Sequence, residues 1–208
     1  MKITYLLVIC LMLTALSSVA QSDSTKKKAF LYTSNGIGFS FPVGGSDVLK
    51  PKFSTSLGLN INLGKKGWFL YPKLNLQVFR YDQQISEPGY NYAIQKGRAT
   101  TYLVNVAAGY RLSQDKFTFY PFLGAGGGMI IAPRIRVDAN NQAILESVTI
   151  WTPGFEGGFG AEYAIGQIKL FAEGSYQTGT KKIEDKRFSA VPVFVGIKSN
   201  ISGIFAKK

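Results

Sequence analysis

Polar and apolar residues alternate along most of this chain, and clusters of turn-forming residues interrupt the alternation at intervals. A period of two indicates β-strands with one apolar face, and no stretch after the N-terminus shows a helical period of useful length. The pattern predicts eight strands, at 31–41, 53–63, 68–82, 98–112, 117–132, 148–164, 168–177 and 188–201.

The connections between these segments alternate in length. Three are tight turns, at 64–67, 113–116 and 165–167, and four are long, at 42–52, 83–97, 133–147 and 178–187. Short turns at one end, long loops at the other and an even number of strands are typical of bacterial outer-membrane barrels. The layout therefore predicts an all-β fold, an eight-stranded antiparallel up-and-down transmembrane β-barrel, with both termini at the short-turn, periplasmic end.

The tight turns fix which residues pair, so the two faces of a hairpin can be compared. Pairing Leu63 with Trp68 gives one face that is almost wholly apolar and another that carries Asn, Ser, Gly and Lys73. A slip of one residue would mix the two sets. The next hairpin, paired as Leu112 with Phe117, separates its residues in the same way.

Glycines concentrate on the polar face. Three of the four glycines in YPFLGAGGGMII, at 120–131, share that face, and Gly160 is expected opposite Glu173 in the third hairpin. An eight-stranded barrel is just wide enough for side chains to fill its interior. Glycines on an interior face would leave room for the aromatic and charged side chains of other strands.

The polar face also carries charged residues on several of the expected strands. Burying such groups is costly unless they pair with one another. We expect a network of paired charges that plugs the lumen. Its expected members are Lys73, Arg111, Glu156, Glu162, Lys169, Glu173 and Lys198.

Periodicity alone does not say which face meets lipid. A soluble, lipocalin-like barrel would turn its Leu and Val residues inward and its polar face to water. The polar face here carries few charges for a solvated surface, and aromatics of the apolar face gather near the turns, as in an interfacial girdle. Both features favour the membrane barrel. The expected girdle consists of Trp68, Tyr110, Phe117, Phe119 and Tyr163.

Four prolines fall inside expected strands, where each removes a hydrogen bond of the ladder. The membrane barrel requires local bulges or tolerated losses at these positions. They are Pro72, Pro121, Pro153 and Pro192.

The N-terminus has the features of a secretory signal peptide: a basic Lys2, an apolar run and small residues before Gln21. We expect a signal peptide at 1–20, a periplasmic segment at 21–30, the barrel at 31–205 and a basic tail at 206–208. Cys10 would leave with the signal. No apolar run of about 18 residues follows, so the sequence predicts no transmembrane helix in the mature chain.

Three segments carry a family resemblance: YPFLGAGGG at 120–128, GFEGGFGAEYAI at 154–165 and FAEGSYQ at 171–177. They resemble the small outer-membrane β-barrel proteins of the porin-like, OmpA-like group. The resemblance covers the mature chain in layout and its last hundred residues or so in motif. It implies contact with the barrel-assembly machinery, which reads a terminal aromatic, although here Phe205 is followed by three further residues.

The residue content limits the chemistry. The chain has no His, and its one Cys lies in the expected signal peptide, so Ser–His catalysis and His- or Cys-based metal sites are excluded. We expect no enzyme activity, no cofactor and no metal. A net charge of +12 could indicate a nucleic-acid partner, but the secretion signal favours outer-membrane lipid and lipopolysaccharide as partners. We expect the protein to be a monomer. The expected function is an envelope component or a binder of surface ligands through the four long loops. The alternatives are a narrow passive channel for small solutes and a soluble periplasmic carrier.

Overall fold

A computed structural model describes residues 30–44, 48–64, 67–87, 90–137, 142–183 and 186–202. All of the regular structure in these ranges is β-strand apart from a single-residue turn near the end. The strands are β1 (Leu31–Pro42), β2 (Leu49–Asn62), β3 (Trp68–Glu87), β4 (Tyr90–Tyr110), β5 (Leu112–Gln114), β6 (Phe117–Val137), β7 (Ala143–Ile165), β8 (Ile168–Ile183) and β9 (Lys186–Asn200).

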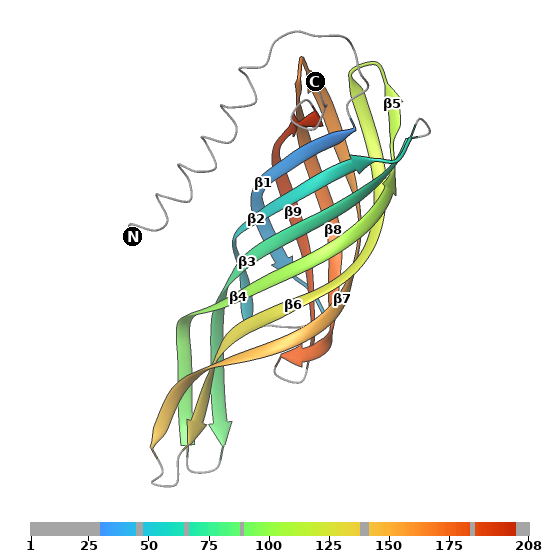
Figure 1. The fold of residues 1–208 in the computed structure, drawn as a ribbon. Helices are drawn as coiled ribbons and strands as arrows, with labels where there is room; N and C mark the ends of the chain where they lie inside the picture. The colour runs from blue at the N-terminus through green and yellow to red at the C-terminus, as the bar shows by residue number, and fades with distance from the viewer. Residues whose placement is uncertain are drawn as a thin grey trace.

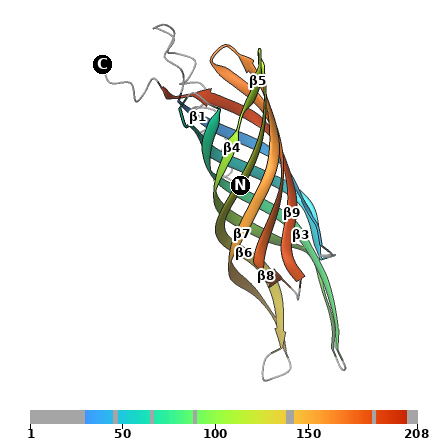
Figure 2. The same cartoon turned by 90° about the vertical axis from the view of Figure 1, so that its right-hand side faces the viewer.

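The strands form one antiparallel sheet that closes on itself. Each long strand pairs with its neighbours in sequence, β4 pairs with β6, and β9 returns to pair with β1. β5 is a three-residue continuation of β4 that pairs with β6, so the closed ring contains eight strands. Figure 1 shows the tilted strands around a common axis, and Figure 2 shows the closed side with β7, β8 and β9. The predicted fold class is confirmed.

The strands are longer than the sequence analysis predicts. The ranges 83–97, 133–147 and 178–187 are wrong as long loops, because most of their residues continue the flanking strands, and five of the eleven residues of 42–52 also belong to β1 or β2. β3 and β4 remain paired up to Glu87 and Tyr90, and β6 and β7 up to Val137 and Ala143. Figure 1 shows these two hairpins projecting well beyond the other strands at the lower end. Backbone hydrogen bonds between the paired strands hold these hairpins together, although they have no apolar face. Sequence periodicity detects a strand only where one face is apolar, so it did not detect these extensions.

The first predicted register is confirmed, and the second is wrong by two residues. The amide of Leu63 donates to the carbonyl of Trp68 over 2.8 Å, and Gly58 lies opposite Lys73 as predicted. In the second hairpin, Leu112 pairs with Phe119 and not with Phe117. A two-residue turn at Asp115–Lys116, with Asp115 at φ 52°, replaces the expected four-residue turn. A shift of two preserves the faces, because side chains alternate with period two.

The apolar face points outward along the barrel. Leu74, Val104, Leu123 and Val195 are all exposed, with Leu123 at 71 %, whereas Lys73 and Lys198 are buried. This is the inverse of a water-soluble barrel, and the soluble-carrier alternative is therefore wrong. No helix in the described part of the chain is long and apolar enough to cross a membrane.

The four in-strand prolines interrupt the ladder on one side only. Pro72 pairs with Val106 of β4, but the β2–β3 ladder lacks the pairs between Gly58–Lys73 and Ile61–Leu70. Pro121, Pro153 and Pro192 likewise have a partner on one neighbouring strand and none on the other. The register continues unchanged across the gaps at Pro72, Pro121 and Pro192. No bulge forms at these four positions, because the missing N–H of one residue affects one ladder only.

The inward glycines fill two structural roles. A Cβ on Gly160 would overlap the ring of Tyr120, so this glycine makes room for an aromatic side chain as predicted. A Cβ on Gly126 or Gly128 would instead overlap a backbone carbonyl oxygen of β4, Val104 or Tyr102 respectively. These two glycines allow close approach of two backbones, a role that the sequence analysis did not anticipate.

Several predictions lie outside the described residues. They are the signal peptide at 1–20, nearly all of the segment 21–30, Phe205 and the tail 206–208.

Candidate functional site: a charged network inside the barrel

The structure places all seven predicted lumen residues inside the barrel and joins them into two groups. They come from β3, β7, β8, β9 and the junction between β4 and β5. Four cations and three carboxylates leave an interior charge of 4 − 3 = +1. Their side chains are 0–1 % exposed apart from Arg111 and Lys169, at 8 % and 18 %.

Lys73 holds the first group together. Its Nζ lies 2.7 Å from Oε1 of Glu156 and 2.7 Å from Oε1 of Glu173, so one cation faces two carboxylates across the lumen. Asn105 Nδ2 and Ser175 Oγ donate to the oxygens of Glu156, each over 2.8 Å. These donors supply the additional hydrogen bonds without which a buried ion pair is costly.

Glu162 is the centre of the second group. Lys169 and Lys198 donate to its two oxygens, each over 2.7 Å, and Nε of Arg111 lies 3.8 Å from Oε1. The guanidinium of Arg111 also donates to the side-chain oxygens of Asn60 and Asn62. Three cations therefore surround one carboxylate.

Tyr120 connects the two groups. Its hydroxyl accepts from Lys198 over 3.0 Å and donates to Glu173 over 3.1 Å. Aromatic rings cover the ammonium groups: Lys198 lies 4.2 Å from the ring centroid of Tyr120, and Lys73 lies 4.2 Å from that of Phe122. Cation–π contacts gain strength in a desolvated site, so the rings stabilise charges that water cannot reach.

Uncharged layers continue the interior toward the projecting hairpins. Gln77 donates to Gln177 over 2.6 Å, and Thr101 donates to Gln77 over 3.2 Å. An apolar cluster lies beyond them, with Phe79 packed edge-on against Phe188 at 5.9 Å between ring centroids. The sequence analysis missed this cluster, although Phe79 has the same strand parity as Lys73 and was therefore assignable to the interior.

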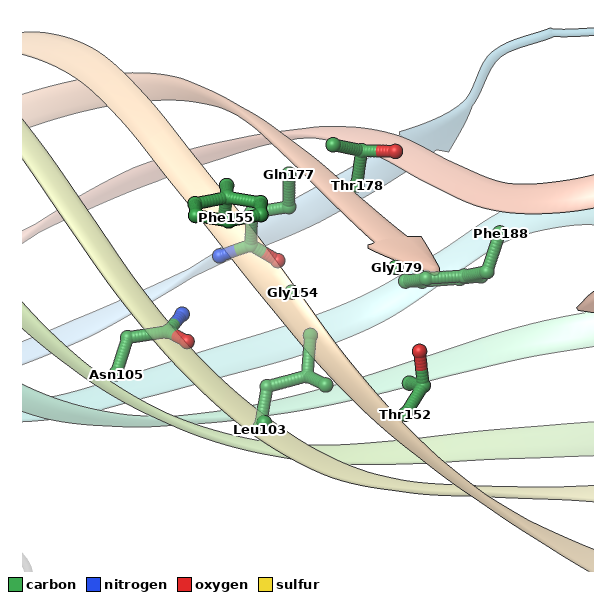
Figure 3. A pocket seen from close by; sticks show the side chains of 10 residues that line it. Leu103, Asn105, Thr152, Gly154, Phe155, Gln177, Thr178, Gly179 and Phe188 are labelled. Carbon is green, nitrogen blue, oxygen red and sulfur yellow. The ribbon is translucent and has the colours of Figure 1, made fainter. Parts of the chain in front are cut away.

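A small gap lies between these layers. It is lined in part by Leu103, Asn105, Thr152, Gln177 and Phe188, which Figure 3 shows converging from different strands. Its volume is about 10 Å³. That is about the space of one water molecule.

The five predicted girdle aromatics lie on the outer face near the short turns. Trp68 packs edge-on against Tyr110 at 5.3 Å between ring centroids, and Phe117 packs against Tyr163 at 4.8 Å. Phe119 stacks on the ring of Phe159 at 6.0 Å. Their contact with the head-group region of a membrane remains a prediction.

A second set of exposed aromatics lies nearer the projecting hairpins, and the sequence analysis did not single it out. Tyr102 stands eight residues from Tyr110 along β4, about 20 Å along the axis at a rise of about 3.3 Å per residue and a tilt of about 40°. This spacing fits within the roughly 25 Å apolar band of outer-membrane barrels. The exposed aromatics of this set are Phe39, Phe41, Phe53, Tyr102 and Trp151.

The acidic groups of the interior are tied into ion pairs. Within the described residues, no group of three His, Cys, Asp or Glu side chains is placed to hold a metal ion. Glu156 and Glu173 are near each other, but both are ion-paired to Lys73 and buried away from solvent. The arrangement pairs opposite charges inside the barrel.

A closed antiparallel barrel with apolar residues outward and paired charges inward has the architecture of an integral membrane protein, because every strand edge in hydrocarbon needs a partner. The sequence matches the family described as "Outer membrane protein beta-barrel domain" over residues 8–198, and the chain belongs to that family. It is thus an outer-membrane protein.

Solved structures share the fold. Neisserial surface protein A is similar with a TM-score of 0.54 and 12 % identity, over 82 % of this chain and 97 % of that one. The attachment invasion locus protein of Yersinia pestis has a TM-score of 0.47 and 14 % identity, over 83 % of this chain and 99 % of that one. The N-terminal barrel of Pseudomonas aeruginosa OprF has a TM-score of 0.42 and 11 % identity, over 80 % of this chain and 96 % of that one. A search of curated proteins found no match.

Proposed function

We propose that this protein is a non-enzymatic, non-conducting outer-membrane barrel that acts through its surface-exposed ends. The observation that supports the proposal is the set of paired side chains that cross the interior. Lys73 joins β3 to β7 and β8 through Glu156 and Glu173, directly across the path of any solute. The apolar cluster around Phe79 and Phe188 lies farther along the same path.

Conductance tests the proposal directly. The purified, folded protein in a planar bilayer is expected to show no steady single-channel current, because the interior side chains leave no continuous water path. A large and steady conductance would contradict the proposal. Small solute-dependent swelling of liposomes, without discrete channels, would favour the second candidate, a narrow passive pore for small solutes.

The projecting hairpins are the proposed site of surface contact. Across the sequence ranges at this end, 42–52, 80–98, 133–147 and 178–187, eleven Lys and Arg stand against seven Asp and Glu, an excess of 11 − 7 = +4. We infer that this end contacts the phosphate groups of lipopolysaccharide, because basic residues attract anionic head groups. The exposed cations are Lys50, Lys52, Arg80, Lys96, Arg98, Arg134, Lys181, Lys182 and Arg187.

A further inference from the structure

An open cavity of about 970 Å³ lies at the short-turn end of the barrel, at its rim. It forms because the strand made of β4 and β5 stops pairing with β3 at Arg111 and continues beside β6 alone. The amide of Arg111 donates to the carbonyl of Gly67 over 2.9 Å, whereas Leu112–Gln114 pair only with β6. The hairpin of β5 and β6 therefore extends past the neighbouring ends of β2 and β3, as Figure 1 shows at the upper end. The opening that remains connects the lumen mouth with the outer face.

The two sides of this cavity differ in chemistry. Its inner side carries two cations, Arg111 and Lys169. Its outer side carries the aromatics Trp68, Phe117 and Phe119, and all three are about half or more exposed. A ligand that uses both sides has an anionic group and an apolar part.

The charge next to the cavity is unbalanced. Arg111, Lys169 and Lys198 face the single carboxylate of Glu162, which leaves a formal excess of 3 − 1 = +2. The other two interior carboxylates are paired with Lys73. The buried Nε of Arg111 has no hydrogen-bond acceptor within the described ranges. Uncompensated buried charge is costly, and an anion in the cavity would offset it.

Phosphate is an anion that suits this pair of cations. The guanidinium of arginine binds phosphate through two parallel hydrogen bonds, and lysine binds it as a mobile point charge. Aromatic belts lie at the level of lipid head groups. A phosphate held between Arg111 and Lys169 would therefore leave attached acyl chains against Trp68 and Phe117.

We propose that this rim cavity is a binding site for the phosphate head group of an anionic membrane lipid. Arg111 and Lys169 bind the phosphate, and the outer aromatics contact the acyl chains. The proposal rests on the barrel's place in the membrane and is independent of what the projecting hairpins bind.

The test is native mass spectrometry of the full-length barrel in neutral detergent, with phosphatidylglycerol, phosphatidylcholine or inorganic phosphate added in separate arms. The expected result is one retained phosphatidylglycerol, at least tenfold weaker retention of phosphatidylcholine, and no comparable retention of inorganic phosphate. Equal retention of the two lipids would overturn the charge argument. Inorganic phosphate bound as tightly as the lipid would overturn the assignment to a lipid.

Variants assign the binding to the cavity. Lys169→Gln is expected to weaken phosphatidylglycerol retention about tenfold, and Trp68→Ala is expected to weaken it while leaving any inorganic-phosphate binding unchanged. Lys116→Gln, at the exposed tip of the hairpin of β5 and β6 at the same end of the barrel, is the matched control and should retain lipid as the parent does. Only preparations that show the heat-dependent gel shift of a folded barrel are compared. Unchanged retention in folded Lys169→Gln would refute the site.

Discussion

Single buried cations determine whether the interior of this barrel is stable. Lys73→Met is expected to lower the free energy of unfolding by about 3–5 kcal/mol, because it leaves two carboxylates facing each other without a counter-charge. Urea unfolding of the barrel in detergent, followed by tryptophan fluorescence, measures the change. Lys52→Met removes an exposed cation of the same type and is expected to change the value by less than about 0.5 kcal/mol. Equal effects of the two substitutions would contradict the buried network.

Within the strands, the cost of replacing a glycine depends on what occupies the space of an added Cβ. Gly160→Ala is expected to destabilise the barrel by about 1–3 kcal/mol, because the new methyl group overlaps the ring of Tyr120 and overpacking strains a filled core. Gly174 lies on the neighbouring strand and has no heavy atom within 4 Å of an added Cβ. Gly174→Ala is therefore the control, with an expected change near zero. The same unfolding assay compares the two.

At the scale of an element, the β3–β4 hairpin depends on one carboxylate at its bulge. The pairing shifts between Tyr81 and Gln83, and Lys96 takes φ 57° opposite the shift. The amide of Lys96 donates to Oδ1 of Asp82 over 2.7 Å, and Arg80 and Lys50 also lie near that carboxylate. The hydrogen bond from the Lys96 backbone is the main cause that lowers the pKa of Asp82 below its usual value of 3.8.

Because the pKa of Asp82 is lower in the folded than in the unfolded chain, its carboxylate stabilises the bulge fully at pH values above the unfolded pKa, near 3.8. This stabilisation is lost as the pH falls through the lower pKa of the folded state. Asp82→Asn is expected to increase hydrogen exchange of the Lys96 amide at neutral pH and to remove its acid dependence below about pH 4. Glu146→Gln, in the other projecting hairpin, is the control. The same acid dependence in Asp82→Asn would show that another group controls this hairpin.

Element boundaries and contacts across the lumen were the least predictable features. Strand parity, read from Leu63 and Trp68, separated the two faces, and the low charge of the polar face and the aromatics near the turns indicated which face points outward. It did not predict where strands end, because outside the membrane the backbone ladder persists without an apolar face. Parity also cannot specify that Lys73 joins Glu156 and Glu173 whereas Lys169 joins Glu162. Those pairings depend on the curvature of the closed barrel, which no local pattern encodes.

At the scale of the whole molecule, the end with the projecting hairpins carries the exposed cations that are proposed to contact lipopolysaccharide. A double substitution, Arg98→Gln with Arg134→Gln, is expected to weaken binding to lipopolysaccharide micelles at least tenfold at low salt, since each basic residue near an anionic surface contributes about 1 kcal/mol. The difference should shrink at high salt because ions screen exposed charges. Lys116→Gln, at the opposite end, should bind as the parent does. No difference between the double variant and this control would reject the proposed contact.

Closure between the first and last strands has a consequence for how the chain must be made. β1 and β9 pair from Tyr32–Asn200 to Pro42–Ala190, so the two ends of the sequence complete the wall together. A chain that is truncated before β9 has two unpaired sheet edges. Each amide or carbonyl group on these edges would lie in the hydrocarbon of the bilayer without a hydrogen-bond partner, at a cost of several kcal/mol. Insertion must therefore wait for the final residues of the barrel, and prematurely terminated products should accumulate outside the bilayer as substrates for proteases.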